Sequence, residues 1–287
     1  MGSFKVLDGA MGSELIKNGV VLHKHTWSAD ANISHPGLIE QIHREYIDAG
    51  ADFITTNTFR TTPRAYAKTG LGSLNSEVCV ERARAALEQA VKLAKKAAIS
   101  STKIIGSIAP LEDCYQPNLF PGKDMAVYEF SLLGSWLNDA GADIIILETM
   151  NSLVEAEAGL EALKGLNCPV WVSFVLKNDN HLLSGDSLYN ALSVLNNYDV
   201  DKVLLNCNPL FRTKRAVDII VDNWHSDWGI YPNLGVGDPN PHGNIVELES
   251  IKTFLSVIEY ALDAGAHILG ACCGSSPKHI KEITKLH

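Results

Sequence analysis

The sequence predicts an α/β fold, a single (β/α)8 TIM barrel. Two observations predict it: a junction that repeats three times, and eight short apolar runs that alternate with helical patterns over 287 residues. Strands joined by helices in this alternation form a parallel sheet. A doubly wound open sheet is the structural alternative, but no Gly-rich dinucleotide-binding fingerprint follows the first apolar run.

The repeated junction joins a helical pattern to an apolar run. It is present as "YIDAGADFITTN" (46–57), "LNDAGADIIILET" (137–149) and "ALDAGAHILGACC" (261–273). In each copy a glycine ends the helical pattern. Glycine adopts the left-handed conformation just past a helix without a Cβ penalty, so each copy predicts a tight helix-to-strand turn.

The apolar runs predict the strands in order. They cover residues 4–8, 52–57, 103–108, 143–148, 169–175, 202–207, 229–233 and 267–272. Between them, "PGLIEQIHREYIDAG" (36–50) and "EVCVERARAALEQAVKLAKKAA" (77–98) have the apolar spacing of amphipathic helices. Eight alternations in one chain of this length fit the barrel. Since no linker or low-complexity stretch interrupts them, we expect one domain over residues 1–287.

Composition narrows the class of protein. The chain is 46% hydrophobic and 20% charged, and its formal net charge is −9, which disfavours a nucleic acid as partner. No apolar stretch reaches the roughly 18 residues of a membrane span, and "MGSFKVLDGA" lacks the apolar region of a secretory signal. The six cysteines are scattered, which indicates free thiols in a reducing compartment. We therefore expect a cytoplasmic protein, monomeric or weakly oligomeric, that acts on small molecules.

Chemically active side chains stand where the predicted strands end. Barrel enzymes place their active sites at the carboxyl ends of the strands. Residues at those ends are Asp8, Asn57, Ser107, Glu148, Ser173, Cys207, Asn233, Cys272 and Cys273. Two carboxylates and three thiols are thus expected to converge on one end of the barrel.

The three thiols predict a metal site. Thiolates are soft ligands, and three cysteines with an open fourth position are typical of catalytic zinc. Cys272 and Cys273 are adjacent and would face opposite ways in a strand, so the backbone must turn there, and Gly274 gives it that freedom. "SSPKHI" (275–280) then predicts a helix start, whose partial positive charge favours a thiolate.

Other candidates for this site carry less weight. Cys114, in the loop after the third strand, could approach the same end of the barrel. His23 and His25 are expected to be solvated loop histidines, because three cysteines already make a ligand set. Residues 238–249 have nearly the spacing of a calcium loop, but two prolines interrupt it and no helix precedes it.

Motifs along the whole chain resemble one family. In order they are "VLDGAMGSEL", "TWSA", "GADFITTNTFRTT", "GSIAP", "DIIILETM", "LLNCNP", "YPN" and "GACCGSSPKHI". Together they resemble the homocysteine S-methyltransferase family over essentially the full length. The resemblance implies a (β/α)8 barrel that binds Zn²⁺ through Cys207, Cys272 and Cys273.

The resemblance also implies substrate-binding residues. Asp8 and Glu148 are expected to hold the amino group of homocysteine, as suits two carboxylates that face an ammonium. The turn at Gly9 is expected to offer backbone N–H groups to the substrate carboxylate. Trp27 corresponds to an aromatic side chain near the methyl donor, where a cation–π contact contributes about 0.5–2 kcal/mol.

The implied reaction moves a methyl group from a sulfonium donor to the thiolate of homocysteine and gives methionine. S-methylmethionine is the first expected donor and S-adenosylmethionine the second, because little sequence follows "CCG" and betaine-dependent relatives have a long extension there. A betaine or methylfolate donor, and a selenol or another thiol as acceptor, stay open. "GSIAPLEDCYQP" and "YPNLGVGDPNPHG" depart from the usual family pattern. A non-catalytic zinc barrel or a redox-sensing barrel is the alternative from a different class.

Overall fold

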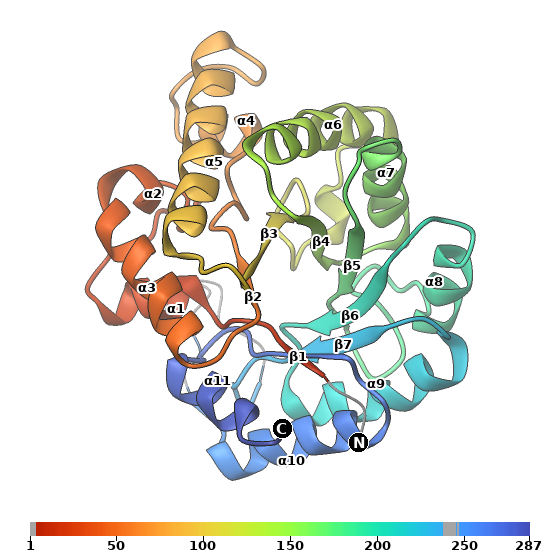
Figure 1. The fold of residues 1–287 in the computed structure, drawn as a ribbon. Coiled ribbons are helices and arrows are strands. Elements are labelled where there is room, and N and C mark those ends of the chain that lie inside the picture. The colour runs from red at the N-terminus through yellow and green to blue at the C-terminus, as the bar shows by residue number, and fades with distance from the viewer. Residues whose placement is uncertain (1–3, 238–244, 246) are drawn as a thin grey trace.

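Eight parallel strands form a barrel with helices around it (Figure 1), as the sequence predicts. This computed structural model describes residues 4–237, 245 and 247–287. The strands are β1 (Lys5–Val6), β2 (Phe53–Thr55), β3 (Lys103–Ile108), β4 (Ile144–Met150), β5 (Val170–Phe174), β6 (Lys202–Asn206), β7 (Trp228–Tyr231) and β8 (Ile268–Leu269). Each lies within or overlaps one of the predicted runs.

The sheet closes on itself. Its hydrogen-bonded order is β1-β8-β7-β6-β5-β4-β3-β2, and every pair is parallel. Between the ends of this order, Leu7 forms a parallel bridge with Phe53. Two backbone hydrogen bonds flank the bridge, from Asp8 N to Phe53 O at 3.0 Å and from Asp52 N to Val6 O at 2.8 Å. This closure excludes the doubly wound open sheet.

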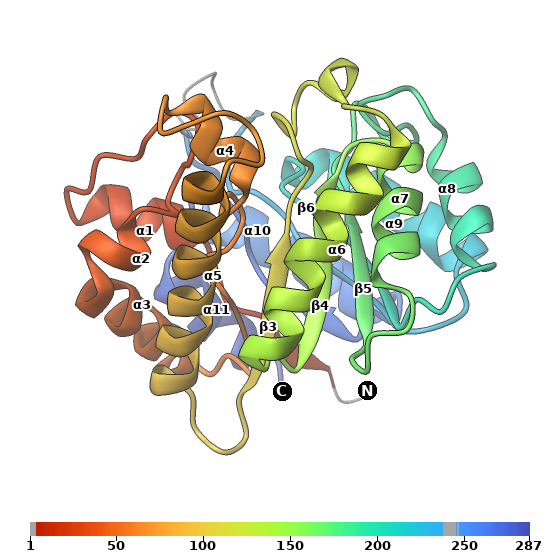
Figure 2. The same cartoon turned by 90° about the horizontal axis from the view of Figure 1, so that it is seen from above.

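Helices cover the outside of the barrel. They are α1 (Met11–Lys17), α2 (Ala31–Ser34), α3 (Pro36–Asp48), α4 (Pro63–Lys68), α5 (Glu77–Ala97), α6 (Lys123–Ala140), α7 (Leu153–Leu163), α8 (Leu188–Leu195), α9 (Leu210–Asn223), α10 (Ile251–Asp263) and α11 (Pro277–Thr284), with a 3-10 turn η1 (Pro117–Leu119). In the side view of Figure 2, both termini lie at one end of the molecule and α4 lies at the other. No helix among the described residues is long and apolar enough to cross a membrane.

The three predicted helix-to-strand turns have the expected backbone. Gly50, Gly141 and Gly265 have φ angles of 102°, 82° and 95°. These values lie in the left-handed region that glycine enters without a Cβ penalty. Each turn therefore reverses the chain within one or two residues and feeds a buried strand, which is what an eight-fold βα alternation requires.

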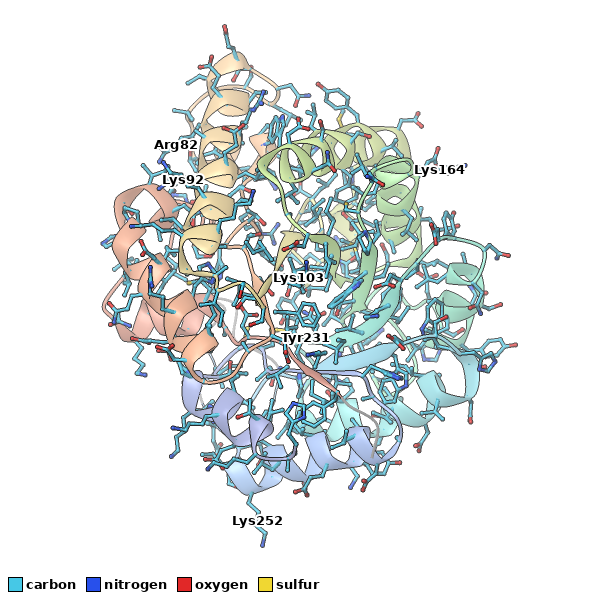
Figure 3. All side chains as sticks on the ribbon, viewed as in Figure 1. Arg82, Lys92, Lys103, Lys164, Tyr231 and Lys252 are labelled. Atoms are coloured by element: carbon cyan, nitrogen blue, oxygen red, sulfur yellow. The ribbon has the colours of Figure 1, made fainter. Side chains whose placement is uncertain are left out.

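The barrel interior contains an apolar cluster of side chains from six strands and the residue that follows β1. One buried cluster consists of Leu7, Ile105, Ile144, Ile146, Trp171, Leu204, Tyr231 and Ile268. In Figure 3, Tyr231 lies near the barrel centre, while Lys92, Lys164 and Lys252 point outward from the helices. Such a filled interior leaves chemistry to the strand ends, where the polar side chains lie.

Gly229 is a position where the closed barrel tolerates no side chain. It pairs with Ile268 across β7 and β8, and an added Cβ would collide with the backbone carbonyl of Ile268. Because backbone cannot move aside as a flexible side chain does, we expect Gly229→Ala to lower the free energy of unfolding by about 1–3 kcal/mol.

Chemical denaturation followed by circular dichroism measures this change. Gly37→Ala is the matched control, because nothing lies within 4 Å of its added Cβ and it has ordinary helical backbone. Equal stability of the two variants would contradict the close approach of β7 and β8.

Candidate metal centre and active site

Three thiols meet at the carboxyl end of the barrel. The sulfur of Cys207 lies 3.0 Å from that of Cys272 and 3.3 Å from that of Cys273, and the other pair is 3.9 Å apart. They form the one group of three or more His, Cys, Asp or Glu side chains among the described residues that could hold a metal ion. All three cysteines are free thiols. The structure thus brings together the three cysteines that the strand ends suggest.

Cys207 follows β6 in a strained conformation. Its φ is +55°, in the left-handed region that a non-glycine residue seldom occupies. Its N–H donates to Tyr231 O at 3.2 Å, and its carbonyl accepts from Asn233 Nδ2 at 2.9 Å. These bonds from the end of β7 stabilise a backbone that would otherwise relax. Strain of this kind is concentrated at functional sites, where it aims a side chain.

Cys272 and Cys273 reach the same point because strand β8 ends early. The predicted strand extends to residue 272, whereas β8 ends at Leu269. Cys272 N donates to Pro232 O at 2.7 Å, and Cys273 O accepts from Leu234 N at 2.9 Å. Gly274 then has a φ of +82°, so the chain turns where the sequence predicts a turn. Leaving the strand ladder lets both adjacent sulfurs face one side.

The helix after the cysteines begins as predicted. Ser276 is the N-cap of α11, and it forms a capping box with His279. Pro277 occupies the first helical position. The turn is also tied to the first βα loop, because Gly274 N donates to Ser13 Oγ at 2.9 Å and Ala10 N donates to Ser275 Oγ at 2.9 Å. The first and last loops of the barrel therefore hold each other in place.

The thiols share charge unequally. Hydrogen bonds from Cys207 and Cys272 hold the pKa of Cys273 well below its usual range. The same contacts, with burial, raise the pKa of Cys272 well above it. A cation at the centre of the three thiols would favour the ionised form of each.

Asp8 and Glu148 are the two carboxylates of this end. Asp8 accepts from Thr55 N at 2.8 Å and from Thr55 Oγ1 at 3.0 Å, but burial outweighs these bonds and raises its pKa to about 8. Glu148 accepts from Ser107 Oγ at 2.5 Å, and burial, then the charge of Cys207, raises its pKa to about 7. Both groups therefore have a strong electrostatic preference for a cationic ligand.

Asn206 fixes the backbone beside Glu148. Its Nδ2 donates to Thr149 Oγ1 at 2.7 Å, and its Oδ1 accepts from Thr149 N at 3.2 Å and from Ser173 Oγ at 2.7 Å. Thr149 has a φ of +60° and would be strained without these bonds. The sequence analysis did not single out Asn206, although it adjoins Cys207 in the "NCNP" motif. The Asn206 side chain thus links β4, which carries Glu148, to the end of β6, which Cys207 follows.

Gly9 has a packing reason to be glycine. An added Cβ would meet Ser275 Oγ at 2.6 Å and the ring of Tyr46 at 2.7 Å. Sequence reasoning expected the backbone N–H groups of this turn to face a ligand. The Ala10 N–H instead donates to Ser275. Of this turn, the N–H groups of Gly9 and Met11 are the ones left to contact a ligand.

Trp27 lies in the first βα loop with a φ of +49°. An added Cβ at Gly12 would meet its Nε1 at 2.9 Å, so the indole lies against the first turn of α1. The neighbouring Ser28 is held by Asn57, whose Oδ1 accepts from Ser28 Oγ at 2.5 Å and whose Nδ2 donates to Ser28 O at 2.9 Å. The end of β2 thereby fixes the loop that carries the indole.

The remaining candidates lie outside the thiol group. His23 is exposed, and neither it nor His25 joins the cluster, as expected. Cys114 is buried near enough that the charge of Cys207 raises its pKa, after burial, to about 12, but its sulfur is not one of the three. Residues 238–244 and 246 of the calcium-like stretch are outside the described part of the chain.

The sequence analysis did not single out two tyrosines, Tyr231 and Tyr115, whose hydroxyl groups are buried. Tyr231, at the end of β7, has its hydroxyl beside Glu148, and burial followed by that charge raises its pKa well above the usual range. Tyr115 lies in the β3–α6 loop, and burial followed by the charge of Cys207 raises its pKa well above the usual range. Each hydroxyl lacks a hydrogen-bond partner among the described residues. "YPN" and "DCY" contain them, but no periodicity marks a contact made across strands.

The sequence and the structure of this chain are similar to those of known methyltransferases. A family model described as homocysteine S-methyltransferase matches residues 5–287. Homocysteine S-methyltransferase 3 of Zea mays is 30% identical over 98% of this chain and 89% of that protein. A selenocysteine Se-methyltransferase of Brassica oleracea var. italica is 27% identical over 99% and 89%. The metallated form of the homocysteine methyltransferase MmuM of Escherichia coli superposes with a TM-score of 0.85 at 26% identity, covering 100% of this chain and 97% of that chain.

Fold and site together define a (β/α)8 barrel enzyme with a cysteine cluster that could bind a metal at the carboxyl ends of its strands. The chain belongs to the homocysteine S-methyltransferase family, and it is therefore a methyltransferase. The family resemblance drawn from the sequence motifs is confirmed.

Asn233 offers a test of how the thiol site is held. The side chain is fully buried and bonds both Cys207 O and Gly235 N, each at 2.9 Å. We expect Asn233→Ala to cost roughly 1–3 kcal/mol of stability for each group left unpaired. Because Cys207 would lose its support, metal affinity should fall roughly tenfold or more.

Denaturation and competition for Zn²⁺ with a chromogenic chelator measure the two effects. Asn197→Ala is the control, since that exposed amide bonds only the carbonyl of Val194 in its own helix end. A variant with unchanged metal affinity would show that Asn233 does not position Cys207.

Proposed function

We propose that this enzyme transfers a methyl group from a sulfonium donor to the thiolate of homocysteine, with Zn²⁺ held by Cys207, Cys272 and Cys273. The carrying observation is the three-thiol group, which no fourth His, Cys, Asp or Glu joins among the described residues. Three protein ligands leave one tetrahedral position for a substrate.

The donor set fits zinc. Zn–S bonds of about 2.3 Å in a tetrahedron place the sulfurs about 3.8 Å apart. The Cys272–Cys273 pair is at 3.9 Å, and the two pairs with Cys207 are shorter, at 3.0 and 3.3 Å, so the three sulfurs are already gathered as closely as a zinc site requires. When bound, zinc supplies the charge that makes a coordinated thiol a thiolate near neutral pH.

The carboxylates are suited to orient the amino acid. Homocysteine carries an ammonium group. Asp8 is buried and Glu148 is half-buried, and the charge of Glu148 contributes to the raised pKa of Asp8. Ser107 and Thr55 fix the two carboxylates by hydrogen bonds, so their oxygens are already aimed before the ligand arrives. Such orientation accelerates a transfer between two bound substrates without any proton moving through either acid.

The donor is proposed on its charge. The half-exposed indole of Trp27 lies next to α1, and a sulfonium methyl over its ring would gain cation–π stabilisation. The thiolate attacks the methyl carbon as the bond from that carbon to the sulfonium sulfur breaks. The donor then leaves as a neutral thioether, and the acceptor becomes a thioether that binds metal more weakly. S-methylmethionine is the first candidate and S-adenosylmethionine the second.

A selenol acceptor is a second candidate. It is supported by the similarity to the selenocysteine Se-methyltransferase of Brassica oleracea. The one-domain organisation over residues 1–287, a cytoplasmic location and a monomeric or weakly oligomeric state stay predictions from the sequence.

A methyl-transfer assay tests the function. Zinc-loaded protein would be incubated with homocysteine or selenocysteine and each of four donors: S-methylmethionine, S-adenosylmethionine, betaine and a methylfolate. Mass spectrometry of the products is the readout. We expect methionine from a sulfonium donor. Methyl transfer from betaine alone would show that the donor is betaine and not a sulfonium compound. No transfer from any donor would favour a non-catalytic zinc barrel or a redox-sensing barrel.

Cys273→Ser tests whether the thiol group binds the metal that the reaction requires. We expect it to lose bound zinc and methyl transfer together, because a hydroxyl is a poor replacement for a thiolate. Elemental analysis and the methyl-transfer assay measure the two losses. Cys79→Ser, in the buried face of α5, is the control that removes a thiol elsewhere. Full activity in a zinc-free Cys273→Ser protein would overturn the proposed site.

Amino-acid binding should depend on pH. In the free enzyme burial raises the pKa of Asp8 to about 8 and that of Glu148 to about 7. An ammonium ligand favours the ionised acids, so binding must displace protons below those values. Methionine, which has no thiol to titrate, should therefore bind at least tenfold more weakly at pH 6 than at pH 8.

Isothermal titration calorimetry with methionine across pH 6–9 measures how the affinity depends on pH. The affinity should rise through pH 7 and 8 and then level off. Glu148→Gln should bind methionine more weakly at every pH and with a shallower slope. An affinity that does not change with pH would mean that neither acid binds the amino group.

A further inference from the structure

Trp27 has a backbone conformation that an aromatic residue seldom adopts. Its φ of +49° lies in the left-handed region, which is unfavourable for a bulky side chain. Among the described residues, three other non-glycine residues share this conformation: Asn75, Thr149 and Cys207. Asparagine enters the region readily, whereas Thr149 and Cys207 lie at the strand ends that carry the site. Since strained backbone is concentrated at functional sites, the conformation of Trp27 indicates an indole that is placed for a ligand.

The residue before Trp27 is held by hydrogen bonds that reach α5. Thr26 is fully buried, and its Oγ1 donates to Asp30 Oδ2 at 2.7 Å. Arg82 Nη2, from α5, donates to Asp30 Oδ1 at 3.0 Å. Trp27 also exchanges two backbone hydrogen bonds with His23, of 2.8 and 3.3 Å. The chain is therefore closed into a turn just before the indole, and this turn is tied to a barrel helix.

Asn57, just past β2, holds the residue after Trp27 with both ends of its amide. Its Oδ1 accepts from Ser28 Oγ at 2.5 Å, and its Nδ2 donates to Ser28 O at 2.9 Å. The same Nδ2 donates to Asn32 Oδ1 at 2.8 Å, and Asn32 Nδ2 donates back to Asn57 O at 2.9 Å. All three of these polar side chains are buried. The amide, which donates and accepts together, thus fixes both the side chain and the backbone of Ser28.

These bonds stabilise a loop that strain would otherwise relax. The half-exposed indole lies against α1, where an added Cβ at Gly12 would meet its Nε1 at 2.9 Å. A cation gains from an aromatic ring only when it lies over the face of the ring, within about 6 Å of the centroid. Rotation of the Trp27 backbone out of the left-handed region would turn that face away. The affinity for a cation over the ring therefore depends on what holds Ser28.

We propose that Asn57 is a positioning residue for the methyl donor: through Ser28 it holds the indole of Trp27 where the indole face meets the cationic group of the donor. The proposal rests on the donor site of the proposed function. It separates the two substrates, because among the described residues no hydrogen bond joins the Asn57 side chain to Asp8, Glu148 or a thiol. Loss of the amide therefore weakens donor binding and leaves acceptor binding in place.

Steady-state kinetics with S-methylmethionine and homocysteine test this separation. We expect Asn57→Ala to raise the KM of the donor about tenfold, the range of a lost cation–π contact, and to leave the KM of homocysteine unchanged. Thr62→Ala is the matched control for lost stability. It removes the buried cap of α4 in the same β2–α4 loop, whose Oγ1 accepts from Ala65 N at 3.0 Å, and should leave both KM values unchanged.

A double-mutant cycle shows whether Asn57 acts through the indole. In a Trp27→Ala background, Asn57→Ala should not raise the donor KM further, because the group that it positions is gone. Protein labelled with 5-fluorotryptophan gives a second readout. Trp27 is one of five tryptophans, and its ¹⁹F resonance is assigned by its loss in Trp27→Phe. This resonance should shift in Asn57→Ala and stay in place in Thr62→Ala.

Ser28→Ala covers the case in which Asn57→Ala folds poorly. It removes the bond between Ser28 Oγ and Asn57 Oδ1 and leaves the bonds from Asn57 Nδ2, so a smaller rise in donor KM is expected. An unchanged donor KM in these variants, or an equal rise with and without Trp27, would overturn the proposal. No methyl transfer by the parent protein, or an unchanged donor KM in Trp27→Ala, would instead overturn the donor site of the proposed function, so the two failures are distinct.

Discussion

The convergence of three sulfurs is the constraint on which the rest of the site depends. Cys207 comes from the end of β6 and the other two thiols from the end of β8, with β7 between them. The chain bends at the ends of both strands and brings the three sulfurs to one point. The left-handed backbone of Cys207 and the turn at Gly274 are those two bends.

Three buried asparagine side chains stabilise the bent strand ends by hydrogen bonds. Asn206, Asn208 and Asn233 are all fully buried, and each bonds backbone groups at the ends of neighbouring strands. Asn208 Oδ1 accepts from Leu176 N at 2.7 Å, which ties the end of β5 to the same motif. Because amides present donor and acceptor together, they can satisfy strand ends that have left the regular ladder. "NCNP" is thus a structural motif as well as a source of one thiol.

Features set by local chemistry were predictable from the sequence. The glycine turns, the eight apolar runs and the cap of α11 depend on a few adjacent residues, and all are present. The hydrogen bonds from Asn233 to Cys207 O and from Thr149 N to Asn206 were not predictable, because they join the ends of different strands and leave no periodic trace. The early end of β8 was hidden for a similar reason: Ala271 N and Cys272 N bond Asp8 O and Pro232 O, which lie just past β1 and β7.

Charge explains why these groups belong at one end of the barrel. Without a cation, burial raises the pKa of Asp8 and Glu148, and the contacts with Cys207 and Cys273 raise that of Cys272. A metal ion among the thiols and an ammonium between the acids would each favour the ionised forms. The two cations would also lessen the mutual repulsion of Glu148 and Cys207. Under the proposed function, the metal and the amino acid therefore increase each other's affinity. The metal neutralises the thiolates, which favours ionised carboxylates, and the ammonium neutralises the carboxylates, which favours ionised thiols.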